Sequence, residues 1–217
     1  MASQIIYGVQ PVREAERGRR RVHKVWRVPE TSAAELERLC GSPDHQGVVA
    51  EVDPYPYGDA EGMLRTPDAL IVALDQVQDP RNLGAVCRSA ESAGAAGVVI
   101  PERRAAMVTP VACKTSAGAV EHLEVAHVRN LADWLAAAKD AGFWIWGADA
   151  GGSQPPWSVD LTGPTVLVLG GEGKGLRPRV ASSCDGLVAL PRRGQVESLN
   201  VSAAATALLF ESVRQRS

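Results

Sequence analysis

An apolar run followed by four closely spaced glycines stands in the second half of the chain, which reads Val166-Leu167-Val168-Leu169-Gly170-Gly171-Glu172-Gly173-Lys174-Gly175-Leu176. An unbroken apolar run is typical of a strand that is buried on both faces. The glycines that follow let the backbone approach a ligand that a side chain would block. Because open α/β sheets bind ligands at the carboxyl ends of their strands, this stretch predicts a strand followed by a ligand-binding loop.

Two further segments carry polar residues at the ends of predicted elements. Before the last helix the chain reads Leu190-Pro191-Arg192-Arg193-Gly194 and then Glu197-Ser198-Leu199-Asn200-Val201-Ser202. Far upstream, another predicted helix opens with Asp79-Pro80-Arg81-Asn82-Leu83-Gly84-Ala85-Val86-Cys87-Arg88. Three segments of this kind predict one composite site.

Strands and helices alternate strictly from residue 69 onward. Apolar runs predict strands over residues 70–74, 97–100, 123–128, 143–148, 165–169 and 187–190. Helical patterns follow over residues 82–93, 108–119, 131–141, 177–184 and 200–214. Such alternation predicts an α/β fold with a mainly parallel sheet and helices on both faces.

The same patterns predict two domains joined by a linker. Residues 1–53 form a small α/β unit, in which Ser32 and Glu35 have capping-box spacing at the start of a helix over residues 32–40. Residues 54–68 begin with a stretch rich in Pro, Gly and Asp, as linkers do, and residues 69–217 form the larger domain. The last helix carries an apolar stripe, which packs into the core or forms a subunit interface: Val201, Ala204, Ala205, Leu208 and Leu209.

Charge and cysteine usage narrow the class of protein. The net charge is −2, so no global basic field indicates nucleic acid, but residues 1–28 hold seven Arg and Lys against two Glu. That local excess predicts either a phosphate-binding face or a solvated surface. The four cysteines are far apart and the histidines lack ligand spacing, so no metal is expected. Without a secretory signal or a membrane-length apolar run, we expect a cytoplasmic protein with no membrane contact.

The glycine-rich loop does not match the common nucleotide-binding motifs. A phosphate loop needs Gly where Val168 stands and Ser or Thr where Gly175 stands. The spacing G-x-G-x-G also departs from the dinucleotide fingerprint G-x-G-x-x-G. Both nucleotide hydrolysis and NAD binding are therefore disfavoured.

Local patterns alone leave structural interpretations open for the polar residues. Asn82 suits a helix N-cap, and Ser198, Asn200 and Ser202 are also capping types. Arg81 and Arg88 lie seven residues apart on one helical face, where two guanidinium groups can hold a phosphate. An ion pair with Glu91 is the simpler interpretation of Arg88, and the local pattern favours it.

In their order and spacing, the segments beginning at Asp79, Leu169 and Leu190 resemble the three motifs of the SpoU family of RNA ribose 2′-O-methyltransferases, in the SPOUT superfamily. The resemblance runs from about residue 69 to residue 216. Tyr7-Gly8-Val9 and Gln46-Gly47-Val48-Val49-Ala50 also resemble the two ends of an L30e-like RNA-binding domain. That domain occurs in the bacterial branch that methylates a guanosine of large-subunit rRNA. It is expected to be shortened here, because the chain passes almost directly from residue 28 to the helix over residues 32–40.

The resemblance implies S-adenosylmethionine as the cofactor, held in a C-terminal trefoil knot. General rules of chain topology argue against knots, so this expectation comes from the resemblance alone. Carried over residue by residue, the cofactor-binding set is Gly170, Gly171, Ala189, Leu190, Ser198 and Leu199, and the catalytic set is Arg88, Asn82, Glu172 and Asn200.

The resemblance also implies two partners, RNA and a second copy of the chain. The residues expected to bind RNA are Arg19, Arg20, Arg21, Arg81 and Arg192, of which Arg192 stands where the family often has Met. In the family the arginine equivalent to Arg88 is proposed as the base. Because the pKa of arginine lies above about 12, we interpret Arg88 as a phosphate clamp and hydroxyl polariser, and the identity of the base stays open.

The expected function is S-adenosylmethionine-dependent methylation of a ribose 2′-hydroxyl, in a guanosine of large-subunit rRNA. Two related alternatives are a tRNA methyltransferase of the same fold and an rRNA methyltransferase that confers antibiotic resistance. The alternative from another class is a catalytically silent RNA-binding protein, against which the presence of all four catalytic-type residues argues.

Overall fold

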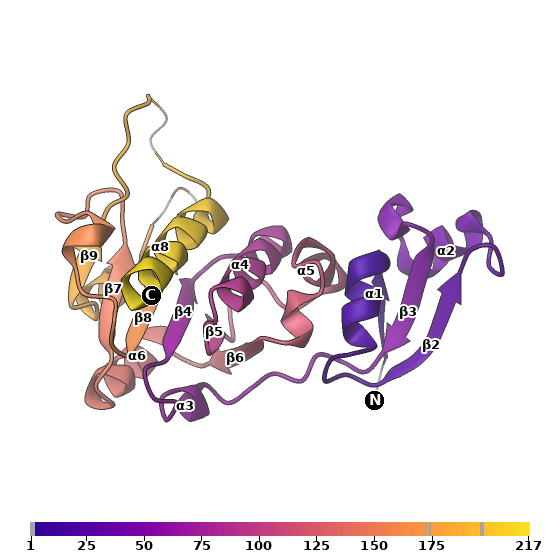
Figure 1. The fold of residues 1–217 in the computed structure, drawn as a ribbon, viewed down its shortest axis with the longest axis horizontal. Coiled ribbons are helices and arrows are strands. Elements are labelled where there is room, and N and C mark those ends of the chain that lie inside the picture. Colours follow the sequence, from indigo (N-terminus) through magenta and orange to yellow (C-terminus); the bar gives the residue numbers. More distant parts are fainter. Residues whose placement is uncertain (1–2, 172, 174, 196–197) are drawn as a thin grey trace.

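A small antiparallel sheet and a larger parallel sheet form the molecule (Figure 1). The computed structural model describes residues 3–171, 173, 175–195 and 198–217. The small sheet has the strand order β1-β3-β2, from β1 (Gln4–Tyr7), β2 (Val22–Arg27) and β3 (Val48–Val52). Its helices are α1 (Val9–Ala15), α2 (Ala33–Cys40) and the 3₁₀ turn η1 (Pro43–His45). The Ser32 hydroxyl caps α2 by accepting a hydrogen bond from the backbone N–H of Glu35, as its spacing predicted.

The larger sheet has six strands in the order β6-β5-β4-β8-β7-β9, and every neighbouring pair is parallel. Its strands are β4 (Leu70–Asp75), β5 (Gly97–Pro101), β6 (Glu124–Val128), β7 (Trp144–Ala148), β8 (Thr165–Gly170) and β9 (Gly186–Val188). The predicted parallel sheet is confirmed. The chain runs outward from β4 to β6 and then crosses to the other side of β4, so the strand order reverses between β4 and β8. Ligand sites of α/β sheets lie beyond the strand ends at such a point.

Helices cover both faces of the larger sheet, which confirms the predicted layering. Leu70, Val72 and Leu74 of β4 face the core beneath α4 (Pro80–Ser92), α5 (Pro110–Thr115) and α8 (Val201–Arg216). Ile71 and Ala73 face the opposite core. That core lies beneath α3 (Ala60–Met63), α6 (Leu131–Asp140) and α7 (Pro178–Ser182). The remaining 3₁₀ turns are η2 (Ala119–Glu121) and η3 (Pro156–Ser158).

The apolar stripe of the last helix is mainly a core feature. Val201, Ala205, Leu208 and Leu209 are buried against the larger sheet. One predicted helix, over residues 108–119, is much shorter in the structure. It begins after the capping residue Thr109 and ends before residues 117 and 118, whose positive φ angles turn the backbone out of the helix.

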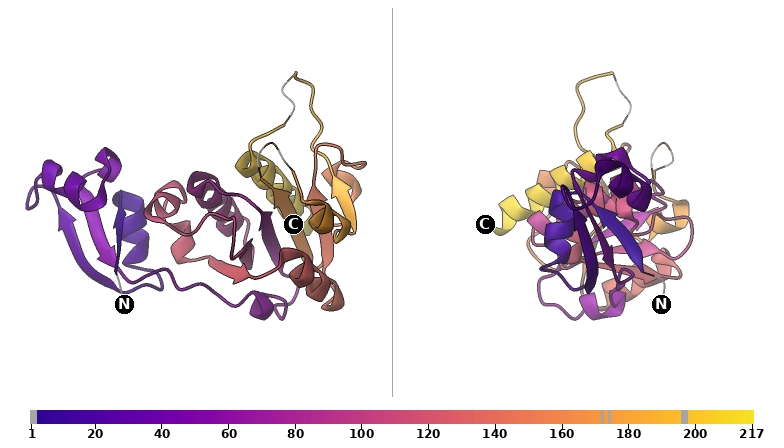
Figure 2. Two further views of the ribbon diagram at one scale, coloured as in Figure 1. Left: turned by 180° about the vertical axis from the view of Figure 1, so that it is seen from behind. Right: turned by 90° about the vertical axis from the view of Figure 1, so that its right-hand side faces the viewer.

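The two sheets share a continuous apolar core, although the molecule is elongated (Figure 2). Ile6 and Val52 of the small sheet belong to the same buried cluster as Val98 of the larger one. The expected linker also packs closely, because the backbone N–H of Gly58 donates to the carbonyl of Val125 over 2.9 Å. The small unit is therefore docked on the larger one.

The cysteines are free, and two of them are fully enclosed. Burial raises the pKa of Cys87 to about 12 and that of Cys113 to about 11. Both thiols therefore stay protonated and pack as small apolar side chains. Among the described residues, no helix is both long and apolar enough to cross a membrane.

Candidate active site

A cavity of about 370 Å³ opens beyond the carboxyl ends of β7, β8 and β9, on the β8 side of the point where the strand order reverses. Its walls come from the loops after these strands and from the start of α8. The residues that line it are Ala148, Asp149, Ala150, Leu169, Gly170, Gly171, Gly173, Gly175, Val188, Leu190, Arg192, Ser198, Leu199, Val201, Ala204 and Leu208.

The glycine-rich loop after β8 folds back on itself and on β4. The backbone N–H of Gly171 donates to the carbonyl of Asp75 over 2.9 Å, and that of Gly175 donates to Gly171 over 3.1 Å. A Cβ atom at Gly170 would lie 2.1 Å from the carbonyl carbon of Gly175, and one at Gly171 would lie 2.6 Å from the carbonyl oxygen of Gln76. Backbone packing within the site therefore demands glycine at both positions, a constraint that the sequence pattern did not reveal.

A buried carboxylate anchors the far end of this loop. Asp75, at the end of β4, is fully buried, and its two oxygens accept from the backbone N–H of Arg177 over 2.8 Å and from its Nε over 2.7 Å. Sequence analysis missed this pair. An acidic residue ending an otherwise apolar strand was its one visible signal.

A second cavity, of about 290 Å³, adjoins the first on the α4 side and shares with it Gly171, Gly175 and Val201. Its remaining lining comes from the segment between β4 and α4: Gln76, Val77, Gln78, Asp79 and Asn82. Polar groups from all three motif segments therefore meet at two adjoining cavities.

Two asparagines join the first and third segments. The Nδ2 of Asn200 donates to the Oδ1 of Asn82 over 3.0 Å. The Oδ1 of Asn200 caps α8 by accepting from the backbone N–H of Ser202 over 2.8 Å. Asn82 is not the N-cap of its own helix, which corrects the sequence interpretation. Asp79 takes that role, because it directly precedes Pro80 at the start of the helix and its carboxylate accepts from the backbone N–H of Arg81 over 2.8 Å.

Most of the expected cofactor-binding residues line the first cavity: Gly170, Gly171, Leu190, Ser198 and Leu199. Ala189 lies beside it, where its backbone N–H donates to the carbonyl of Gln154 over 2.8 Å. Glu172 lies outside the described residues. Asp149 was missed by sequence analysis, although the glycines that follow it marked another loop after a strand.

Arg88 is exposed on α4 and lines neither cavity. Arg88 forms no ion pair with any described residue. The pair with Glu91 that the local pattern favoured is therefore absent. Arg81, which lies on the same face of α4 as Arg88, is also exposed.

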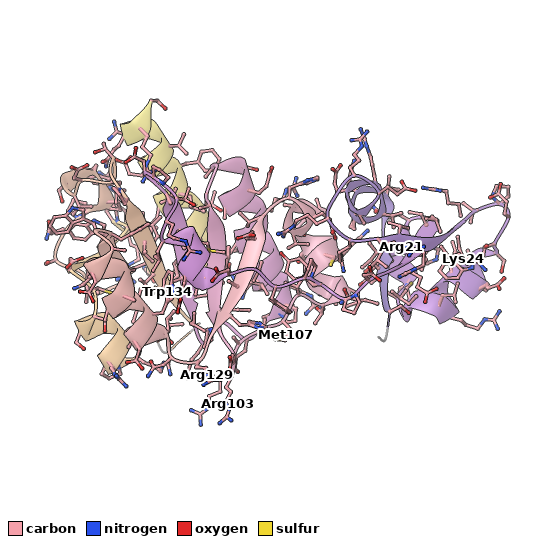
Figure 3. All side chains as sticks on the ribbon, turned by 90° about the horizontal axis from the view of Figure 1, so that it is seen from below. Arg21, Lys24, Arg103, Met107, Arg129 and Trp134 are labelled. Atoms are coloured by element: carbon pink, nitrogen blue, oxygen red, sulfur yellow. The ribbon has the colours of Figure 1, made fainter. Side chains whose placement is uncertain are left out.

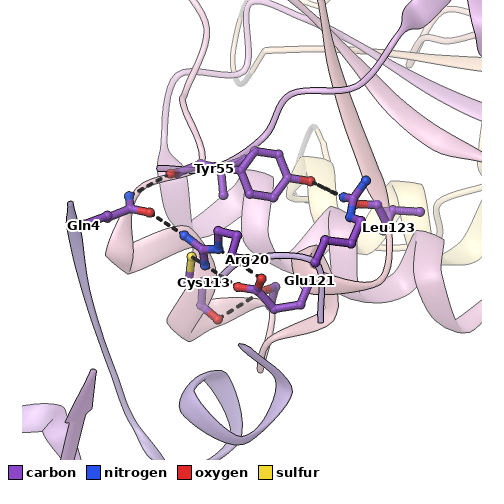
Figure 4. A network of polar contacts seen from close by, with 9 residues as sticks. Gln4, Arg20, Tyr55, Cys113, Glu121 and Leu123 are labelled. Carbon is purple, nitrogen blue, oxygen red and sulfur yellow. Dashed lines mark hydrogen bonds and ion pairs between the residues drawn. The ribbon is translucent and has the colours of Figure 1, made fainter. Parts of the chain in front are cut away.

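The basic residues of the N-terminal unit differ in whether their side chains are accessible to RNA. Arg20 is buried and ion-paired with Glu121, so its guanidinium is not available to RNA, which corrects the expectation for this residue (Figure 4). Arg19 is partly engaged, donating to the carbonyl of Leu123 over 2.7 Å. Arg21 is exposed near Lys24 at the end of the molecule remote from α8 (Figure 3). Arg192 lines the first cavity.

Among the described residues, no three His, Cys, Asp or Glu side chains gather as a metal ion would require. The described residues around the two cavities offer amides, hydroxyls, backbone groups, the carboxylates of Asp149 and Asp79, and the guanidinium of Arg192.

Comparison with known proteins places this geometry in a family. Residues 69–210, which carry all three motif segments, match the model of the SpoU rRNA methylase family. The chain belongs to this family. Residues 27–58 match a second model, described as the substrate-binding domain of RNA 2′-O ribose methyltransferases.

Relatives of this SpoU chain extend the comparison. An uncharacterized tRNA/rRNA methyltransferase of Mycolicibacterium smegmatis is 46% identical over 192 residues, which cover 86% of this chain and 61% of the relative. The chain thus spans about three fifths of the length of that relative. The crystal structure of the SpoU methyltransferase AviRb from Streptomyces viridochromogenes is similar at a TM-score of 0.81 and 32% identity, over 99% of this chain and 90% of that one. The same enzyme in complex with the cofactor AdoMet gives a TM-score of 0.81 at 30% identity, with the same coverage.

Proposed function

We propose that this SpoU chain is an S-adenosylmethionine-dependent RNA methyltransferase that modifies a ribose 2′-hydroxyl, in a guanosine of large-subunit rRNA. The observation that carries the proposal is the pair of adjoining cavities built from the three motif segments. The family models and the AdoMet complex of AviRb support it.

The first cavity suits the cofactor. Its volume of about 370 Å³ lies in the range of small-molecule sites, roughly 300–1,000 Å³. Backbone groups of the glycine loop and the side chains of Leu190 and Leu199 provide a slot for a flat ring, and the carboxylate of Asp149 offers a partner for a cationic group. We also propose that the segments around this cavity form the trefoil knot that the family resemblance implies.

The second cavity suits the ribose that accepts the methyl group. When bound, S-adenosylmethionine supplies the methyl group on a positively charged sulfur. We infer that the amide of Asn82, which lines this cavity, orients the hydroxyl together with Asn200, whose amide donates to Asn82 over 3.0 Å. The residues that line the first cavity would hold the cofactor, which would supply the methyl group to the oriented hydroxyl, and the hydroxyl proton would pass to a base. Positioning of this kind contributes about 7–11 kcal/mol to a reaction barrier.

RNA and a second protomer complete the proposal. Arg21, Arg81 and Arg192 are exposed, as phosphate contacts must be. The outer face of α8 presents a stripe of Ala203, Ala207 and Phe210, with Phe210 47% exposed, and this apolar face suits a second copy of the chain. Because Arg88 lines neither cavity of its own protomer, we place its action in a site completed across that dimer.

Methyl transfer tests the function directly. Purified protein with labelled S-adenosylmethionine should label large-subunit rRNA from a strain that lacks this protein, and mapping of 2′-O-methyl positions should locate one guanosine. Label in tRNA alone would replace rRNA by tRNA as the substrate. Absence of label in both, with cofactor binding also absent by calorimetry, would favour a silent RNA-binding protein.

A further inference from the structure

A third hollow, of about 380 Å³, lies at the carboxyl ends of β5 and β6 and is lined by five arginines. We call it the arginine pocket: Arg103, Arg104, Arg129, Arg177 and Arg179. They come from the loop after β5, from the end of β6 and from the start of α7. These three segments are distant in sequence and meet only in the folded chain. No sequence motif therefore predicted the pocket.

The five arginines differ in whether they have a partner among the described residues. Arg177 is paired with the buried Asp75, and Arg179 with Asp133. Arg103, Arg104 and Arg129 form neither an ion pair nor a hydrogen bond with any described residue, and all three are exposed.

The unpaired arginines keep the pocket basic. Besides Asp75 and Asp133, the acidic residue next to the pocket in sequence is Glu102, which is exposed. The pocket therefore keeps an excess of positive charge. Arg103 and Arg129 project together from one side of the molecule (Figure 3). Unpaired guanidinium groups around a hollow suit an anion with several oxygens, because each guanidinium can bind two oxygens of one phosphate.

The arginine pocket is continuous with the proposed active site. Gln76 lines both this pocket and the second cavity, and the second cavity shares Gly171, Gly175 and Val201 with the first. The three therefore follow one another along the carboxyl edge of the sheet. A nucleotide whose ribose occupies the second cavity would have its neighbouring phosphates at the arginine pocket.

We propose that the arginine pocket binds phosphodiester groups of the RNA next to the nucleotide that is methylated. This inference rests on the proposed function, which places the target ribose in the second cavity. The pocket then holds the RNA close to the reacting hydroxyl, whereas Arg21 and Lys24 lie at the opposite end of the molecule (Figure 3). RNA recognition is thereby divided between two places: Arg21 and Lys24, far from the cavities, and the arginine pocket, next to the reacting hydroxyl.

The test compares two double variants in the full chain. Arg103→Ala with Arg129→Ala removes two unpaired arginines of the pocket and leaves Arg177 and Arg179 in their ion pairs. Arg104 is kept, because its backbone has a positive φ of 59° and its replacement risks a local change of fold. The control is Arg65→Ala with Lys139→Ala, which removes two basic side chains that lie outside the pocket and outside residues 27–58 and that pair with Asp59 and Asp185.

Binding of a mixed-sequence single-stranded RNA is measured as a function of salt, with cofactor binding by calorimetry as the check on folding. The pocket variant should bind RNA roughly tenfold or more weakly, with the salt slope flatter by about 1.4, from about 0.7 for each lost contact. The control should match wild type. Equal affinity and slope for the two variants would overturn the proposal.

The proposed function is judged by a separate readout. Methyl transfer by the wild-type protein decides whether the chain is an RNA methyltransferase, whereas the salt slopes decide whether the arginine pocket contacts phosphates. A wild type that binds RNA through the pocket but transfers no methyl group would leave the pocket assigned and the function refuted.

Discussion

The guanidinium of Arg20 is buried against the carboxylate of Glu121, so an ion pair excluded from water joins the N-terminal unit to the larger SpoU domain (Figure 4). The Nε of Arg20 donates to one Glu121 oxygen over 3.0 Å, and its Nη1 donates to the Oε1 of Gln4 over 2.6 Å. Arg20, which the sequence suggested as an RNA contact, therefore stabilises the contact between the two units.

Glu121→Gln should destabilise the protein by about 3–5 kcal/mol, because it leaves the charge of Arg20 buried without its counter-charge. Urea denaturation measures the free energy of unfolding. The control is Glu16→Gln, which breaks the exposed pair with Arg27 and should change stability by less than about 1 kcal/mol. Similar effects of the two substitutions would show that the buried pair is not holding the units together.

Gly170→Ala should weaken cofactor binding and lower stability by about 1–3 kcal/mol, since its Cβ would meet the backbone of Gly175 and force the loop to move. Gly194→Ala is the matched control, because a Cβ there meets nothing within 4 Å. Calorimetry with S-adenosylmethionine and thermal unfolding report the two effects. A Gly170→Ala protein that binds the cofactor like wild type would remove the glycine loop from the cofactor site.

Arg88→Ala should keep cofactor affinity and change stability by no more than about 0.5 kcal/mol, because the side chain is exposed and has no partner among the described residues. Methyl transfer should fall by roughly 10²- to 10³-fold, as when a group that stabilises developing charge is removed. Glu91→Ala should leave transfer intact. Loss of stability without loss of transfer would assign Arg88 to the fold.

Replacing Arg21 and Lys24 by Ala should weaken RNA binding and flatten its salt slope by about 1.4, from about 0.7 for each lost phosphate contact. Cofactor binding should not change, because both residues lie far from the cavities. RNA affinity is measured by titration at several salt concentrations. The variant is compared with a second double variant, Arg13→Ala with Arg17→Ala. An unchanged slope would leave RNA recognition to the larger SpoU domain.

Phe210→Glu should convert a dimer into a monomer and abolish methyl transfer, since it places a charge on the exposed apolar stripe of α8. Sedimentation velocity at the assay concentration measures the oligomeric state. Ala33→Glu adds the same charge on the exposed surface of α2 and should leave the assembly intact. A wild-type protein that is both monomeric and active would refute the proposed dimer.

The parallel sheet, the helices on both faces and the loops that line the cavities can be predicted from the sequence, because these features depend on local signals. An apolar run such as residues 165–169 has few alternatives to a buried strand, and glycines after it mark a loop. Which charged residues are available to bind a partner depends instead on contacts made in the folded chain. Arg20 and Arg21 are adjacent and chemically identical, yet one meets Glu121 from a distant turn and the other meets solvent. The same holds for the Asp75–Arg177 pair, the Asn82–Asn200 contact and the arginine pocket, which depend on segments distant in sequence whose approach no local pattern records.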